Sequence, residues 1–268
     1  MAIRNNKGAV KGISHAWYVG RRWGVLTFRV LVAVLALNAD VLFAQDSLFV
    51  FKPQRLGSVL PRGDGWIVDR PIATLSGSPE FTFPLQLVYL SVRTQHGLFS
   101  DQWFCPQLES FVLPKGPQAI LWQTLSGNEI ALFADKQRVG FFRDKSEAWL
   151  AKLKGQDIEI TNSDGWRFLY KSGRLLSLTS PTGRVLEFSY KGSATTEVTL
   201  RDPASGSTQL LVQATYDPKN LVQSLQVCGL RHTFTYDSHD GRLLSWTHPG
   251  QPQPDRFAYG KTGELASI

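Results

Sequence analysis

A unit of about twenty residues repeats through the C-terminal half of the chain, and it limits the possible folds more than any other feature. The unit consists of aromatic-x-Tyr, a polar turn that ends in Gly or Asn, and a run of alternating apolar residues. Clear copies start at Phe168, Phe234 and Phe257, and weaker copies contain Tyr190 and Tyr216. The tyrosines fall at positions 170, 190, 216, 236 and 259, at steps of 20, 26, 20 and 23 residues. Each step can hold one β-hairpin.

Every part of the unit has a physical role in a hairpin. The aromatic residue and the tyrosine are two positions apart, so both rings project from the same face of a strand. Asp, Asn and Gly favour the turn, and a return strand such as 243–246 adds apolar side chains. One hairpin buries little surface alone, whereas hairpins side by side form a sheet. We predict that residues 164–268 form a continuous antiparallel meander, with tyrosines 170, 216, 236 and 259 at equivalent strand positions.

The rest of the chain also favours β-structure. Its 23 Gly, 14 Pro and 12% aromatic residues, against a single Met, are typical of turns and pleated strands. Residues 85–90 and 119–123 have the composition and alternation of strands. The expected fold is therefore all-β, an antiparallel meander of hairpins that forms a curved strip or partial shell.

One short helix is expected near residues 145–153. Asp144 or Ser146 can cap its N-terminus, and Gly155 can end it. A soft boundary near Asp157 divides a β-rich N-terminal region, 45–156, from the repeat strip, 157–268. Because no long linker marks this boundary, the sheet is free to run through it.

The first 44 residues have the composition of a targeting segment. They hold six basic residues, one acid and the apolar stretch Leu31–Leu37, which is too short to span a bilayer stably. We interpret residues 1–44 as a signal peptide that is cleaved after Ala44 or, alternatively, Ala39. An uncleaved N-terminal anchor is the other interpretation. The expected location is secreted or extracytoplasmic, in the periplasm or at the cell surface.

The positive charge of the chain belongs mostly to this first segment. The formal net charge is +7, but residues 45–268 carry 23 basic against 21 acidic residues. No run of Lys and Arg remains there to neutralise a line of phosphates. We therefore expect no nucleic-acid partner.

The two cysteines, Cys105 and Cys228, are too few for a disulfide framework. An exported protein could pair them, and buried free thiols are at least as good an interpretation. Neither cysteine lies in a CxxC pair or beside a suitably spaced histidine. They therefore predict no metal site.

The remaining candidates for chemistry have simpler explanations in turns and strands. His232, His239 and His248 lie close in sequence, but their strand and turn positions do not converge, so we expect surface or turn histidines. Asp237 and Asp240 could form a carboxylate pair, yet a β-turn needs Asp at such positions for its own backbone. The sequence contains no nucleophile elbow, phosphate loop or dinucleotide fingerprint. We expect no enzyme activity and no catalytic, cofactor-binding or metal-binding residues.

Eight tryptophans are dispersed along the chain rather than clustered. Packing in the core explains them better than stacking on sugar rings. The exposure of Trp103, Trp166 and Trp246 separates these two explanations. Buried rings support a structural shell, whereas coplanar exposed rings support carbohydrate binding.

The repeats resemble the Rhs/YD-repeat family, which takes its name from the dipeptide present here at Tyr216-Asp217 and Tyr236-Asp237. The resemblance covers about residues 80–268 and includes the upstream segments 87–91 and 97–103. Ser100 and Gln102 replace glycines that the family has at the corresponding turn. In that family the repeats form a β strip that spirals into a hollow shell, often around a C-terminal toxin.

The resemblance implies an exported, non-catalytic scaffold or shell segment, related to toxin scaffolds of the cell envelope, that encloses, displays or anchors a partner or cargo. The alternative is a secreted carbohydrate-binding or adhesive β module that recognises cell-surface carbohydrate. The expected partners are further YD repeats, or a cargo or toxin domain, in a longer protein or a neighbouring chain. The last unit, 257–268, stops within a repeat, which predicts a fragment, a truncated gene or a short member of the family. Its return strand, 264–268, is expected to present an unprotected sheet edge.

Overall fold

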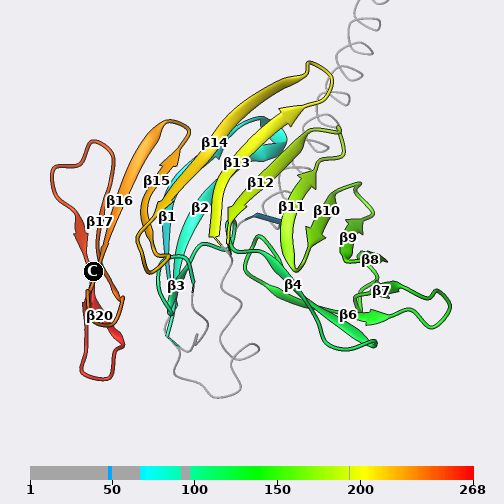
Figure 1. The fold of residues 1–268 in the computed structure, drawn as a ribbon, viewed down its shortest axis with the longest axis horizontal. Coiled ribbons are helices and arrows are strands. Elements are labelled where there is room, and N and C mark those ends of the chain that lie inside the picture. Colours follow the sequence, from blue (N-terminus) through cyan, green and yellow to red (C-terminus); the bar gives the residue numbers. More distant parts are fainter. Residues whose placement is uncertain (1–47, 50–66, 92–96, 193) are drawn as a thin grey trace, which may run out of the picture. The chain divides into compact units, whose positions relative to one another are not determined.

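The computed structural model describes residues 48–49, 67–91, 97–192 and 194–268. The interpretation of residues 1–44 as a signal peptide falls outside these ranges, as do both proposed cleavage sites. In the described ranges, no helix is both long enough and apolar enough to cross a bilayer. Nearly all of the regular structure is β, as the composition predicts (Figure 1).

The first structural part is a small antiparallel sheet. Strand β1, Ile67–Ser76, pairs along its length with β2, Thr82–Leu90, and a short 3₁₀ turn, η1, Pro79–Phe81, joins them. The two-residue strand β3, Trp103–Phe104, pairs with the end of β2. Buried side chains fill most of β2, because both of its faces contact other parts of the protein.

The second part is a ring of eight strands, β4 to β11, which pair in chain order. The ring closes because β11 pairs with β10 on one side and, through Arg174 and Phe111, with β4 on the other. The expected boundary at Asp157 falls inside this ring, so the sheet runs through it. The strands of the ring are β4, Phe111–Pro114; β5, Ala119–Gln123; β6, Glu129–Ala134; β7, Phe141–Arg143; β8, Trp149–Lys154; β9, Asp157–Asn162; β10, Arg167–Lys171; and β11, Arg174–Thr179.

The third part is an open strip that leaves the ring at the far end of β11. There β11 pairs with β12 through residues 177–179, and each following strand pairs antiparallel with the next as far as β18 (Figure 1). The strands of the strip are β12, Val185–Lys191; β13, Ala194–Asp202; β14, Ser207–Tyr216; β15, Val222–Val227; β16, Leu230–Tyr236; β17, Leu243–Thr247; and β18, Asp255–Arg256.

The last repeat does not continue this sheet. Strands β19, Ala258–Tyr259, and β20, Leu265–Ser267, form a separate two-stranded sheet. Within residues 164–268 as described, the pairing is therefore antiparallel and sequential from β10 to β18 and is interrupted before β19. The prediction of a continuous antiparallel meander is confirmed for the strand pairing up to Arg256 and is wrong beyond that residue.

The predicted helix at 145–153 is wrong. Residues 144–148 form a turn, and Trp149–Lys154 form β8. The Asp144 carboxylate does accept backbone hydrogen bonds, from the N–H of Ser146 at 3.2 Å and of Trp149 at 2.9 Å, but it closes a hairpin turn. Glu147 has a left-handed φ of 59°, which an α-helix does not tolerate. An Asp or Ser before an apolar run can therefore cap a helix or close a hairpin turn, so this sequence pattern does not distinguish the two structures.

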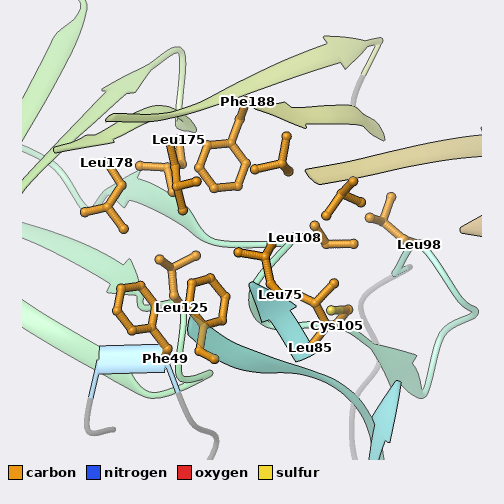
Figure 2. Close-up of a cluster of buried hydrophobic side chains, with 14 of the residues drawn as sticks. Phe49, Leu75, Leu85, Leu98, Cys105, Leu108, Leu125, Leu175, Leu178 and Phe188 are labelled. Atoms are coloured by element: carbon orange, nitrogen blue, oxygen red, sulfur yellow. The ribbon is translucent and has the colours of Figure 1, made fainter. Parts of the chain in front are cut away.

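The core lies between the small sheet, the ring and the strip. Figure 2 shows side chains from all three meeting, among them Leu75 of β1, Leu85 of β2 and Phe188 of β12. Phe49 joins them from the N-terminal side: it is fully buried and stacks on Phe83 with ring centroids 4.2 Å apart. The described part of the chain from residue 48 onward therefore shares one hydrophobic core.

Candidate functional site: a ladder of tyrosine hydroxyls

Each repeat tyrosine lies immediately after a break in strand register. The pairing of its own hairpin shifts between the preceding residue and the tyrosine, which marks a β-bulge. A bulge bends the strand and changes the direction of the next side chain. The break recurs in all five hairpins, directly before tyrosines 170, 190, 216, 236 and 259.

Four of these tyrosines donate a hydrogen bond from the side-chain hydroxyl to a backbone carbonyl of the preceding hairpin. The bonds of Tyr190, Tyr236 and Tyr259 measure 2.7, 2.8 and 2.8 Å, and Tyr216 makes the same contact. The acceptor carbonyls belong, in chain order, to Leu175, Thr195, Val222 and Leu243. We call the four donors the tyrosine ladder.

The acceptors occupy one equivalent position. Leu175 is the backbone partner of Tyr170, and Val222 is the backbone partner of Tyr216. The same relation holds for Thr195 with Tyr190 and for Leu243 with Tyr236. Each ladder tyrosine therefore binds the residue that faces the previous tyrosine, so neighbouring hairpins are joined at a fixed offset.

Burial keeps the ladder hydroxyls neutral. It raises the pKa of Tyr190 to about 12, and it is also the largest cause of the raised pKa values of Tyr216, Tyr236 and Tyr259. A neutral phenol donates its proton, whereas a phenolate cannot. The ladder bonds therefore persist throughout the physiological pH range.

Tyr170, the first repeat tyrosine, faces different partners. Its hydroxyl lies inside the ring, 2.7 Å from the Ser110 Oγ atom, and it accepts a hydrogen bond of 2.7 Å from Trp122 Nε1. The side chains of Tyr170 and Trp122 are almost completely buried. The tyrosine of the first repeat thus packs inside the ring, while the return strand of the same repeat, β11, pairs with the first strand of the strip, β12.

Two residues of the small sheet contact the other end of the ladder. Trp103 Nε1 donates to the Tyr259 hydroxyl at 2.9 Å, and the Leu265 N–H donates to the Tyr89 hydroxyl at 3.0 Å. Leu265 is the backbone partner of Tyr259, just as Leu243 is the backbone partner of Tyr236. Tyr89 therefore binds the last hairpin at the position that is equivalent to the ladder acceptors. A strand from far upstream therefore holds the last described hairpin.

The aspartates that follow the tyrosines serve the turns, as expected. Asp217 Oδ1 accepts from the N–H groups of Lys219 and Leu221, at 2.9 and 2.8 Å. Asp237 Oδ1 accepts from His239 N–H at 2.7 Å, and this bond is the largest cause of its lowered pKa. Asp240 accepts from its own turn at Arg242 N–H. These bonds explain Asp237 and Asp240 without an acid–base role.

The expectation of surface or turn histidines is correct for His239 and wrong for His232. His239 is exposed in a turn, but His232 is 2% exposed and its Nδ1 accepts from Trp246 Nε1 at 3.3 Å. His248 packs against the same tryptophan, and its Nε2 lies 3.0 Å from the Asp255 carboxylate. In the described ranges no three metal-binding side chains come together. Sequence reasoning missed this pair because the two strands had to be aligned before His232 and His248 became neighbours.

The cysteines do not pair in this structure. Both thiols are free, with Cys105 buried and Cys228 exposed at a turn. Burial is the main cause of a raised pKa at Cys105, so its thiol is protonated and unreactive at neutral pH.

The three diagnostic tryptophans are all buried. Trp103 is 0%, Trp166 is 7% and Trp246 is 1% exposed. Their rings pack on other aromatic side chains, such as Trp103 on Phe257 and Trp166 on Phe81. These rings are therefore not available to stack on a sugar.

Comparisons with known proteins give similarities at the level of structure alone. No protein-family model matches the chain, and no curated protein matches its sequence. A crystal structure of TcdB2-TccC3-TEV aligns with 68% of the chain at 11% identity and a TM-score of 0.36. A structure of the Photorhabdus luminescens Tc holotoxin pore, with the TccC3-D651A mutation, aligns with 74% at 10% identity and a TM-score of 0.31. The chain spans about a tenth of the length of each of these chains, and we base no argument on such distant likenesses.

Proposed function

We propose that this protein is an exported, non-catalytic scaffold segment of the YD-repeat type, which encloses, displays or anchors a polypeptide partner. The tyrosine ladder is the observation that carries the proposal. A ladder that joins every hairpin to the one before it gives an open sheet a fixed curvature, which a shell wall requires.

The side-chain chemistry of the strip supports a wall rather than a reaction centre. The Asp side chains of the repeats are used by turns, and the tyrosine hydroxyls by neighbouring backbones. Their donors and acceptors are thus committed to the fold. The inward aromatic residues, such as Phe234 and Trp246, fill the core.

A secreted carbohydrate-binding or adhesive module is the second proposal that the sequence raised. Such a module would need exposed aromatic rings on which sugars can stack. The burial of Trp103, Trp166 and Trp246 argues against sugar binding by these three side chains. We therefore rank the scaffold first. The proposed partner is a polypeptide, either further repeats or a cargo domain.

Site-specific photocrosslinking in the producing cell tests this proposal. A benzophenone amino acid at Ala266 in β20 is expected to crosslink to a polypeptide, and mass spectrometry of the adduct identifies the partner. The control places the same amino acid at Ala204, which is exposed in the turn between β13 and β14. We expect no adduct there, and cell fractionation should recover the protein outside the cytoplasm.

The competing proposal makes a different prediction for the purified chain. A glycan array that gives micromolar binding, together with no polypeptide adduct at Ala266, would replace the scaffold by the carbohydrate-binding module. Equal adducts at Ala266 and Ala204 would show that the crosslinks are nonspecific and would remove the support for a partner at this edge.

A further inference from the structure

The outer surface of the ring carries apolar rings where a strand facing water usually carries polar residues. On β6, Leu132 points inward and is fully buried, while its neighbour Phe133 is 44% exposed. On β7, Phe142 is buried and Phe141 lies on the opposite, outer face. The inner residues already fill the core, so core packing does not account for Phe133 and Phe141.

Cationic groups lie over both outer rings. Lys145 Nζ is 5.9 Å from the centre of the Phe133 ring. Lys152 Nζ and the Arg138 guanidinium lie 5.4 and 5.8 Å from the centre of the Phe141 ring. These distances allow cation–π attraction while the charged ends stay in water. Aromatic and basic side chains therefore form one continuous surface.

The turn between β6 and β7 adds a fully exposed apolar residue. Val139 has no neighbour that shields it, with a relative exposure of 102%, and it lies between Arg138 and Gly140. Figure 1 shows this turn at the end of the ring that is remote from β17. We define the basic hairpin face as Phe133, Arg138, Val139, Phe141, Lys145 and Lys152.

The acidic residues of this region are mostly engaged within their own turns. Asp135 accepts from Gln137 N–H and pairs with Arg143 at 3.2 Å. Asp144 accepts from Ser146 N–H and Trp149 N–H. Residues 135–152 contain five basic against three acidic residues, and Glu147 is the third acid. Most of the negative charge is thus held inside the turns, while the cations of the face project outward.

We propose that the basic hairpin face binds the surface of an anionic lipid bilayer. Phosphate groups would meet the three cations, and Val139 with the two phenylalanine rings would enter the boundary between headgroups and acyl chains. The attraction is that of a peripheral protein, since no part of the face is long enough to span a bilayer. This inference does not depend on the proposed scaffold function, but it would give that scaffold a place to attach.

Shape and charge favour lipid over the other anionic partners. An apolar residue at the tip of a hairpin can insert into a soft interface, whereas a protein partner would need a matching pocket. Nucleic acid requires a row of cations along a phosphate backbone, whereas the three cations of the face cluster around two aromatic rings. The aromatic rings also fit the interfacial region, where such side chains concentrate.

Vesicle binding by the full-length chain tests the proposal. Phosphatidylcholine vesicles with and without phosphatidylserine are compared by cosedimentation, for the unchanged chain and for the double variant Arg138→Glu, Lys145→Glu. Each basic residue near an anionic surface contributes about fivefold in affinity, so the double variant should bind phosphatidylserine vesicles at least about 25-fold more weakly. Val139→Asp should weaken binding as well.

Matched variants separate the face from the rest of the chain. Lys171→Glu with Lys191→Glu removes two exposed lysines, one at the end of ring strand β10 and one at the end of strip strand β12. Leu210→Asp alters an apolar residue that is 48% exposed. These variants should keep the affinity of the unchanged chain. All variants retain residues 1–44, so lipid binding by that segment contributes equally to each.

A local probe provides a second readout. In a Cys228→Ser background, Val139→Cys carries an environment-sensitive dye, and the buried Cys105 remains unlabelled. The dye should shift to shorter wavelength with phosphatidylserine vesicles, and the same dye at Leu210→Cys should not. An unchanged spectrum at position 139, or equal loss of binding in the face and control variants, would overturn the proposal. Binding of a soluble acidic protein but not of vesicles would also overturn it.

Discussion

The repeat unit occurs in both the ring, in its last hairpin β10–β11, and the strip, but the two regions solve the problem of a sheet edge in different ways. The ring, β4 to β11, closes on itself and fills its interior with large side chains such as Trp122, Phe168 and Tyr170. The strip stays open and joins its hairpins through tyrosine hydroxyls. Tyr170 has the same place in the repeat as Tyr236, yet its hydroxyl points into the ring. The surroundings, rather than the unit, thus decide what the tyrosine binds.

The largest effect should come from opening the interior of the ring. Trp122 is 1% exposed, contacts Trp149 and Phe168, and donates to the Tyr170 hydroxyl. Trp122→Ala should lower the free energy of unfolding by about 4 kcal/mol, through the cavity and the lost hydrogen bond. Urea denaturation followed by circular dichroism measures this. Trp149→Ala, at a half-buried site, should cost clearly less, and equal costs would contradict the closed-ring account.

Acid should weaken the strip before it weakens the ring. Burial, followed by the nearby charge of His248, lowers the pKa of His232 to about 4 in the folded protein, against about 6.5 in an unfolded chain. A lowered pKa means that the folded state disfavours the protonated ring. The corresponding stability is complete above pH 6.5 and is lost as the pH falls from 6.5 towards 4, by about 3 kcal/mol.

His232→Asn tests this titration, since its side-chain oxygen can still accept from Trp246. Thermal unfolding between pH 7 and pH 4 should depend less on pH in this variant than in the unchanged protein. His239→Asn changes an exposed turn histidine and should leave the pH dependence intact. If both variants behave alike, burial of His232 does not control the acid sensitivity.

Removal of tyrosine hydroxyls compares the two regions directly. Tyr236→Phe deletes one bond, to the Val222 carbonyl, and should cost about 1 kcal/mol of unfolding free energy. Tyr170→Phe leaves both Ser110 and Trp122 without that partner and should cost about 2 kcal/mol. Chemical denaturation of both variants gives the order. A larger cost for Tyr236→Phe would mean that the ladder, rather than the ring interior, dominates stability.

The smallest effect concerns the β20 edge, where self-association should be weak. Strand β20 is short and its residues are largely exposed, and Ile268 beyond it is 41% exposed. Such an edge can pair with another strand unless a charge or proline interrupts it. Sedimentation of the purified chain at tens of micromolar should show association that Ala266→Lys reduces. A stable monomer at about that concentration would show that the edge is already protected.

Local chemistry made part of this fold predictable. The Asp side chains at 217 and 237 bind turn N–H groups two to four residues away, and the repeat spacing marked the hairpins that contain them. The ring closure between Arg174 and Phe111 could not be predicted, because it joins strands far apart in sequence. The carbonyl groups that accept from the ladder tyrosines could not be predicted either, because a one-residue bulge before each tyrosine decides which carbonyl its hydroxyl contacts. The error at 145–153 came from a cap signal that a hairpin turn uses equally well.

The ladder also has a direction. Each tyrosine binds a carbonyl of the hairpin before it, so an earlier hairpin offers a ready acceptor to the next one, while a later hairpin offers none to its predecessor. We therefore expect the strip to assemble from the ring toward β20, which is also the order in which a ribosome releases the chain. If this order holds, a hairpin that emerges late finds the acceptor carbonyl of the preceding hairpin already in place.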